Sequence, residues 1–168
     1  MATVIRGSDN FDTAYAKSVA VIADVKAYNV HGGTFTSGSF RTRDLNTELD
    51  DPENIVTIAS NQFTLQAGTY LVEWSAPAYK VNTNVSKLQN ITDSVVEAEG
   101  MVAYADNASS DATFSAGAGI VTITSAKVFE IQHRCEGTKA TNGYGVQQSI
   151  ASEVNSVFTL VKIHKIGA

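Results

Sequence analysis

Apolar and polar residues alternate in short stretches along most of the chain, which predicts β-strands. Residues 70–76 alternate most clearly: one face carries Tyr70, Val72, Trp74 and Ala76, and the other carries Leu71, Glu73 and Ser75. Further strands are expected at residues 19–25, 55–58, 63–65, 85–91, 95–104, 112–114, 119–123, 128–133 and 153–166. Residues 94–105 show a weak helical period, but strand alternation describes this segment equally well. The pattern therefore predicts an all-β fold.

The segments between these strands carry turn signals. His31-Gly32-Gly33 predicts a turn, residues 35–43 a short exposed segment, and residues 45–54 a polar loop. Gly117-Ala118-Gly119 predicts a turn between strands, and Asn142-Gly143 predicts a tight turn in the glycine-rich loop over residues 136–145. About nine or ten strands separated by turns, in a single domain, indicate a two-sheet sandwich or a barrel.

The last predicted strand is apolar on both faces. Val154, Phe158, Leu160 and Ile166 have one parity, and Val157, Val161 and Ile163 have the other. A strand with one hydrated face should be polar at one parity, so something must cover the second face. The cover is either a neighbouring subunit or the N-terminal segment of the same chain. Residues 19–25 are also apolar at both parities, and in a jelly roll the first and last strands are neighbours in one sheet.

Composition narrows the class of protein. The 168 residues are enough for one domain, the net charge is −5, and there is one cysteine. A negative chain argues against nucleic-acid binding through a basic surface, and a lone cysteine excludes an intrachain disulfide. No apolar stretch approaches the roughly 18 residues of a membrane span, and we expect neither membrane insertion nor a secretion signal.

Residues 1–17 differ in composition from the rest of the chain. Short apolar groups, including Val4, Ile5 and Phe11, are mixed with polar residues in this segment. It is expected to be an N-terminal arm that precedes a domain over residues 18–168.

Candidate catalytic and metal-binding groups are few, and we expect no cofactor and no metal. His31 adjoins a turn and is expected to be a solvated loop residue, whereas His133 and Cys135 share one face of a strand, where packing is expected. An acidic loop could hold Ca²⁺ but fits a solvated loop better; it contains Glu48, Asp50, Asp51 and Glu53. Catalytic sequence motifs are lacking.

Tyrosines are the better candidates for contact groups. Tyr79 and Tyr104 lie near predicted strand ends and suit contact with a glycan or a protein. Tyr144 lies in the glycine-rich loop, where it serves either such a contact or packing at a subunit interface.

Six segments resemble a pattern in bacteriophage fibre and virion domains. They are NQFTLQAGTYLVEWSAPAY at 61–79, GSFRTRDLNTE at 38–48, SKLQNIT at 86–92, VFEIQHRC at 128–135, NGYGV at 142–146 and VFTLVKIHKI at 157–166. The architecture is similar to the tumour-necrosis-factor and complement globular-head superfamily of trimeric jelly rolls. The resemblance covers residues 18–166, and the opening IRGSDNFDT also resembles phage fibre N-termini.

The resemblance implies an antiparallel two-sheet jelly-roll sandwich that forms a homotrimer. The expected trimer interface contains Val157, Phe158, Leu160, Val161, Ile163 and Tyr144. The implied function is a non-enzymatic virion protein, assembled in the bacterial host cytoplasm: a tail- or head-fibre adhesin that binds a host surface glycan. The N-terminal arm would attach it to other virion proteins. One alternative is a capsid decoration protein, and a remote one is a glycan hydrolase, which would need paired carboxylates.

Overall fold

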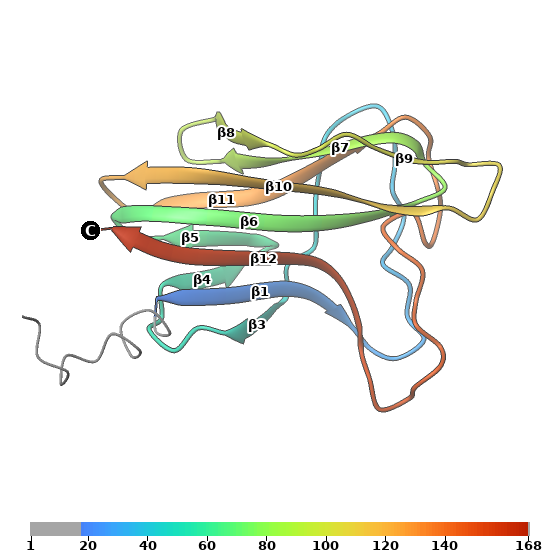
Figure 1. Ribbon diagram of the computed structural model, residues 1–168, viewed down its shortest axis with the longest axis horizontal. Helices are drawn as coiled ribbons and strands as arrows, with labels where there is room; N and C mark the ends of the chain where they lie inside the picture. The colour runs from blue at the N-terminus through green and yellow to red at the C-terminus, as the bar shows by residue number, and fades with distance from the viewer. Residues whose placement is uncertain (1–17, 168) are drawn as a thin grey trace, which may run out of the picture.

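The computed structural model describes residues 18–167, which form twelve strands in two antiparallel sheets (Figure 1). The five-stranded sheet has the order β10 (Ala112–Ile123), β6 (Gly68–Tyr79), β12 (Ser156–Gly167), β1 (Val19–Lys26) and β3 (Thr47–Asp50). The seven-stranded sheet has the order β4 (Val56–Ala59), β5 (Gln62–Leu65), β11 (Lys127–Cys135), β7 (Asn82–Asn90) and β8 (Val95–Glu99). Its two short strands are β2 (Arg41–Thr42), beside β11, and β9 (Ala103–Ala105), beside β7.

The strands alternate as the sequence predicts. In β6, Tyr70, Val72 and Trp74 face the other sheet and are almost fully buried. Ile22, Val161 and Ile163 extend the same core, and Phe63, Leu88, Phe129 and Ile131 reach it from the seven-stranded sheet. The two sheets thus share one hydrophobic core.

The first and last described strands lie side by side, as expected for a jelly roll. Val19 pairs with His164 and Ile22 with Val161 in an antiparallel ladder. Figure 1 shows strands of both sheets along the long axis, with the longest loops gathered at the end opposite the C-terminus.

The prediction of a turn at Gly117-Ala118-Gly119 is wrong, because β10 runs unbroken from residue 112 to residue 123. Gly117 and Gly119 are both required because there is no room for a side chain at either position. A Cβ on Gly117 would lie 2.2 Å from Trp74 Cζ2, and one on Gly119 would lie 2.6 Å from Ala98 Cβ. The glycines let the core and β8 approach a continuous strand.

Two further predictions need correction. Residues 45–54 are not wholly a loop, because β3 pairs with β1 there. The single strand expected at 95–104 is divided into β8 and β9. Between them the N–H of Gly100 donates to Ser86 O in one sheet, and the N–H of Met101 donates to Ala116 O in the other. Residues 100–101 therefore bridge the sheets.

The segment at 35–43, expected to be exposed, is partly internal. Phe35 is completely buried and forms an isolated bridge with Lys139. It belongs to a second, smaller apolar cluster with Ala78, Val81, Ala105 and Cys135. This cluster anchors the loops at one end of the sandwich.

Candidate functional site

The side of the five-stranded sheet that faces away from the core, here called the open face, is the main candidate for assembly. Strand register arranges its side chains in rows across β10, β6, β12 and β1. One row contains Ile120, Leu71, His164 and Val19. The next contains Ala118, Glu73, Lys162 and Val21, and a third contains Ala116, Ser75, Leu160 and Ala23.

Large apolar side chains on the open face are in contact with solvent. Ile120 is 67% exposed, Phe114 60% and Ile166 55%, and Leu160 and Leu71 are half-buried. A hydrated face of an antiparallel sheet is usually polar. An apolar face over the central strands β6 and β12 is instead typical of a surface that another chain covers.

Charged side chains lie in the middle of this face and at its β3 edge, where Asp50 pairs in register with Val21. Lys162 pairs in register with Glu73, and His164 Nε2 lies 3.5 Å from Glu73 Oε2. Both members of the His164–Glu73 pair are partly exposed. A polar patch within an apolar face can fix the orientation of a partner more than it adds affinity.

The interface residues expected from sequence are divided between the interior and the surface. Val161 and Ile163 are fully buried in the core of this chain, and Phe158 is 7% exposed and packs beside Gly145. Val157 is 52% exposed and Leu160 is half-buried. Of the five residues expected from β12, only Val157 and Leu160 leave much surface for a neighbour, so the open face also needs residues of β6 and β10.

Tyr144 lies largely inside the subunit. Its ring packs 4.6 Å from the ring of Phe35, and the Arg43 guanidinium lies 3.9 Å from its centroid. Burial raises the pKa of Tyr144, while Arg43 acts in the opposite direction. The aromatic ring therefore helps to hold Arg43 in place.

Arg43 is a fully buried arginine that the sequence did not single out. Its Nε donates to Thr159 Oγ1 at 2.8 Å, and its terminal nitrogens donate to Pro77 O and Tyr144 O, both at 3.2 Å. Burial lowers the pKa of Arg43 to about 10, so it stays charged near neutral pH. The side chain joins the 41–46 segment to β6 and β12.

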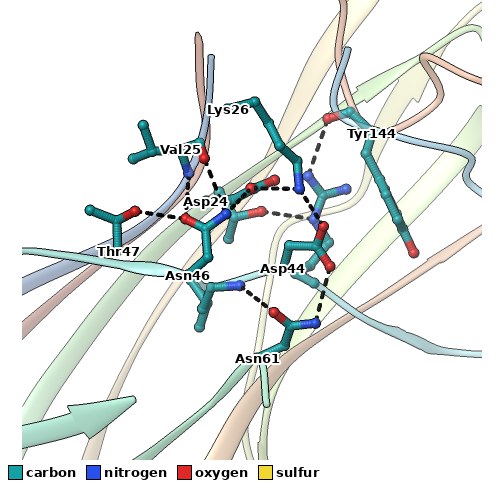
Figure 2. Close-up of polar contacts among 11 residues, drawn as sticks. Asp24, Val25, Lys26, Asp44, Asn46, Thr47, Asn61 and Tyr144 are labelled. Carbon is teal, nitrogen blue, oxygen red and sulfur yellow. Dashed lines mark hydrogen bonds and ion pairs between the residues drawn. The ribbon is translucent and has the colours of Figure 1, made fainter. Parts of the chain in front are cut away.

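An ionic cluster of Asp24, Lys26 and Asp44, drawn in Figure 2, acts electrostatically on Arg43. The Lys26 ammonium lies 3.1 Å from Asp24 Oδ1 and 2.6 Å from Asp44 Oδ2, and Asn46 and Asn61 donate to the same two carboxylates. Burial raises the pKa of Asp24 against the lowering effect of Lys26. Burial alone would lower the pKa of Lys26, but its hydrogen bonds to Asp44 and Asp24 raise it. These groups satisfy one another and form a structural cluster.

His133 and Cys135 are both buried. His133 Nε2 lies 3.0 Å from Asn84 Oδ1, and burial holds the pKa of His133 well below its usual value. The Cys135 thiol donates to Gly137 O, and burial raises its pKa to about 11. A thiol with that pKa is protonated at neutral pH and is a poor nucleophile.

The remaining sequence candidates are dispersed. Tyr104 on β9 is 59% exposed, and Tyr79 at the end of β6 is half-buried. In the acidic loop, the Asp51 carboxylate accepts hydrogen bonds from the N–H groups of Ile55 and Val56, which is a turn-capping role. His31 Nδ1 accepts a hydrogen bond from Gln147 N.

Residues 1–17, including Val4, Ile5 and Phe11, lie outside the described residues. Across residues 18–167, His, Cys, Asp and Glu side chains form no group of three that could hold a metal ion. No helix of the described part of the chain is long and apolar enough to cross a membrane.

Comparison of sequences finds no matching family model and no match among curated proteins. Comparison of structures does find similar folds. Murine APRIL at pH 5.0 has a TM-score of 0.55 at 10% identity, covering 88% of this chain and 99% of that one. PRD1 vertex protein P5 has a TM-score of 0.56 at 10% identity, covering 89% and 97%.

The globular domain of zebrafish complement 1qA has a TM-score of 0.50 at 14% identity, covering 89% of this chain and 98% of that one. At these identities the likeness establishes the fold alone. The chain is an all-β, antiparallel two-sheet jelly roll of the tumour-necrosis-factor type.

Proposed function

We propose that this protein is a non-enzymatic structural component of a bacteriophage virion and that it assembles as a homotrimer through the open face. The observation that supports this most strongly is the row structure of that face. Apolar Ile120 and Leu71 lie on one side of the row that holds Glu73 and Lys162, and Leu160 lies on the other side, although β6 and β12 are central strands of their sheet. Self-association removes this apolar surface from water.

A closed three-fold arrangement suits this geometry. In a cyclic trimer each subunit presents the same surfaces to its neighbours, and no apolar surface is left to recruit further copies. An obligate interface of roughly 2,000 Å² or more is expected. The polar centre at Glu73, Lys162 and His164 would set the register between copies.

Two observations support placement in a virion. The six segments quoted above resemble phage fibre and virion domains, and PRD1 vertex protein P5 has a similar fold. Within the virion we favour a tail- or head-fibre adhesin. Residues 1–17, through Val4, Ile5 and Phe11, would attach it to other virion proteins, and an exposed side chain such as Tyr104 would contact the host surface.

Two measurements test the proposal. Sedimentation equilibrium at micromolar concentration should give three times the chain mass, and immunogold labelling of the intact particle should place the protein on its surface. A stable monomer would overturn the trimer, and a particle that carries no label would overturn the virion assignment. Label on the head shell with no binding to host cells would replace the adhesin by a decoration protein.

A further inference from the structure

A groove lies on the seven-stranded sheet, the sheet that does not carry the open face. Its volume is about 550 Å³. The loop between β1 and β2 forms one wall, and the adjoining ends of β7 and β11 form the other. The lining residues are Ser37, Gly38, Thr83, Asn84, Val85, Arg134, Cys135 and Glu136.

Arg134 is the unusual member of this lining. It is exposed and, among the described residues, has no carboxylate or other acceptor within bonding distance. The neighbouring Arg41 pairs in register with His133 and acts electrostatically on Cys135, so a second positive charge lies nearby. An arginine with free donors binds planar anionic groups in a bidentate manner.

Acceptor and hydroxyl groups line the same groove. Glu136 Oε2 accepts a weak hydrogen bond from Thr83 N at 3.3 Å. Ser37 Oγ lies 2.9 Å from Thr138 Oγ1, which holds the wall loop against the segment after β11. Hydroxyl-bearing ligands can exchange hydrogen bonds with carboxylate and hydroxyl groups in this arrangement.

Gly38 contributes backbone alone to one wall of the groove. Its φ is +98°, and a Cβ placed there would meet nothing within 4 Å. A side chain at this position would be strained and would project into open space beside the lining. The wall is thus formed by backbone, which suits close approach of a flat, polar ligand.

We propose that this groove binds a saccharide that carries an anionic group, with the anion on Arg134 and the sugar hydroxyls on Ser37, Thr83 and Glu136. The inference deepens the proposed function, because it gives the host-surface ligand a site and a chemical class. It does not depend on the trimer for the contact itself.

Assembly would strengthen binding at such a site. The groove lies on the sheet away from the open face, so a trimer formed through that face leaves three grooves accessible. A shallow, open groove gives weak binding per site, and three linked sites on a polymer raise the apparent affinity without new contacts.

Binding of the full chain to immobilised polysaccharides tests the proposal. Polygalacturonate supplies carboxylates, teichoic acid supplies phosphates, and dextran is the neutral control. Binding is expected to at least one anionic polymer and not to dextran. Arg134→Ala should weaken it about tenfold or more per site, and Thr83→Trp should abolish it by filling the groove.

Lys127→Ala is the matched control, because it removes one positive charge from the opposite end of the same strand. It should leave binding unchanged. Binding only to teichoic acid with the same Arg134 dependence identifies phosphate as the anion. No binding to either anionic polymer, equal binding to dextran, or equal losses in both charge variants would overturn the proposal. The mass of each variant is measured separately, so failed assembly is distinguished from a failed site.

Discussion

At the scale of single residues, the most consequential side chains are polar groups buried near one another at the loop end of the sandwich. Arg43 and His133 are completely buried. Sequence placed His133 correctly in a packed position from its strand parity. It could not identify Arg43, because the three acceptors of its guanidinium come from β6, β12 and the segment after β11.

His133 should make the protein sensitive to mild acid. Its Nε2–H donates to Asn84 Oδ1, because the Asn84 amide nitrogen is itself a donor to Ala103 O, and Nδ1 is buried without a partner. Protonation would bury an unpaired N–H close to the Arg43 charge. The pKa of folded His133 is therefore depressed by burial, with Arg43 adding to the effect.

The sign of the pH dependence follows from proton uptake. Below pH 6.5 the unfolded chain binds a proton at this histidine and the folded chain does not, so stability is complete above pH 6.5 and declines as the pH falls. The slope is at most about 1.4 kcal/mol per pH unit. Urea unfolding at fixed protein concentration between pH 7.5 and 5 measures it. His133→Gln should flatten the curve, and His31→Gln should not; equal slopes in all three proteins would contradict the assignment.

Arg43→Met should destabilise the fold by about 3 kcal/mol or more. The substitution leaves the buried Pro77 O, Tyr144 O and Thr159 hydroxyl short of a partner, at about 1–3 kcal/mol for each unsatisfied group. Relief of charge burial offsets part of this loss. Urea unfolding measures the effect, with exposed Arg134→Ala as the near-neutral control. A stabilised Arg43→Met protein would show that charge burial outweighs the hydrogen bonds.

At the scale of elements, periodicity predicted the strands that face the core and failed where tertiary contacts decide the structure. β6 and β11 follow an alternation visible in the sequence, whereas β12 is apolar at both parities. The short edge strand β3 consists mainly of exposed polar residues, so no apolar alternation marks it. In β10, glycines that usually interrupt a strand are required by Trp74 and Ala98, which lie distant in sequence.

A coupled pair of variants tests the role of Gly117. Gly117→Ala should destabilise the protein by about 1–3 kcal/mol, because its methyl group would overlap the indole ring of Trp74. In a Trp74→Phe background the same change should be markedly less harmful, since the benzo ring is gone, although that background also loses the bond to Ser86 Oγ.

Urea unfolding of the four proteins gives the coupling energy, which should be about 1 kcal/mol or more. Ala112→Ser, at the exposed start of the same strand, serves as the control and should change stability by less than about 0.5 kcal/mol. Additive effects of Gly117→Ala and Trp74→Phe would show that the overlap is relieved by movement elsewhere.

At the scale of the whole molecule, the sequence indicated which sheet carries apolar side chains on its outer side, but not the residues that form that surface. In the sequence, β1 and β12 carry apolar residues at both parities, which pointed to the five-stranded sheet. Strand pairing then added Leu71, Ile120 and Phe114, and assigned Val161 and Ile163 to the core of the chain. Which parity faces inward depends on the opposite sheet, so a single strand with two apolar faces leaves that choice open.

The open face gives the last prediction, which concerns assembly. Leu160→Lys and Ile120→Lys each place a charge where the proposed interface would desolvate it, and an unpaired buried charge is strongly unfavourable. Both variants should fold, because these side chains point away from the core, and both should sediment as monomers under conditions where the unmodified protein is a trimer. Ile91→Lys alters a partly exposed isoleucine at the end of β7 in the other sheet and should leave the trimer intact. The opposite result, in which the open-face variants remain trimeric and the Ile91→Lys protein is a monomer, would show that the subunits meet through the seven-stranded sheet. The groove beside Arg134 would then lie on the sheet that forms the interface.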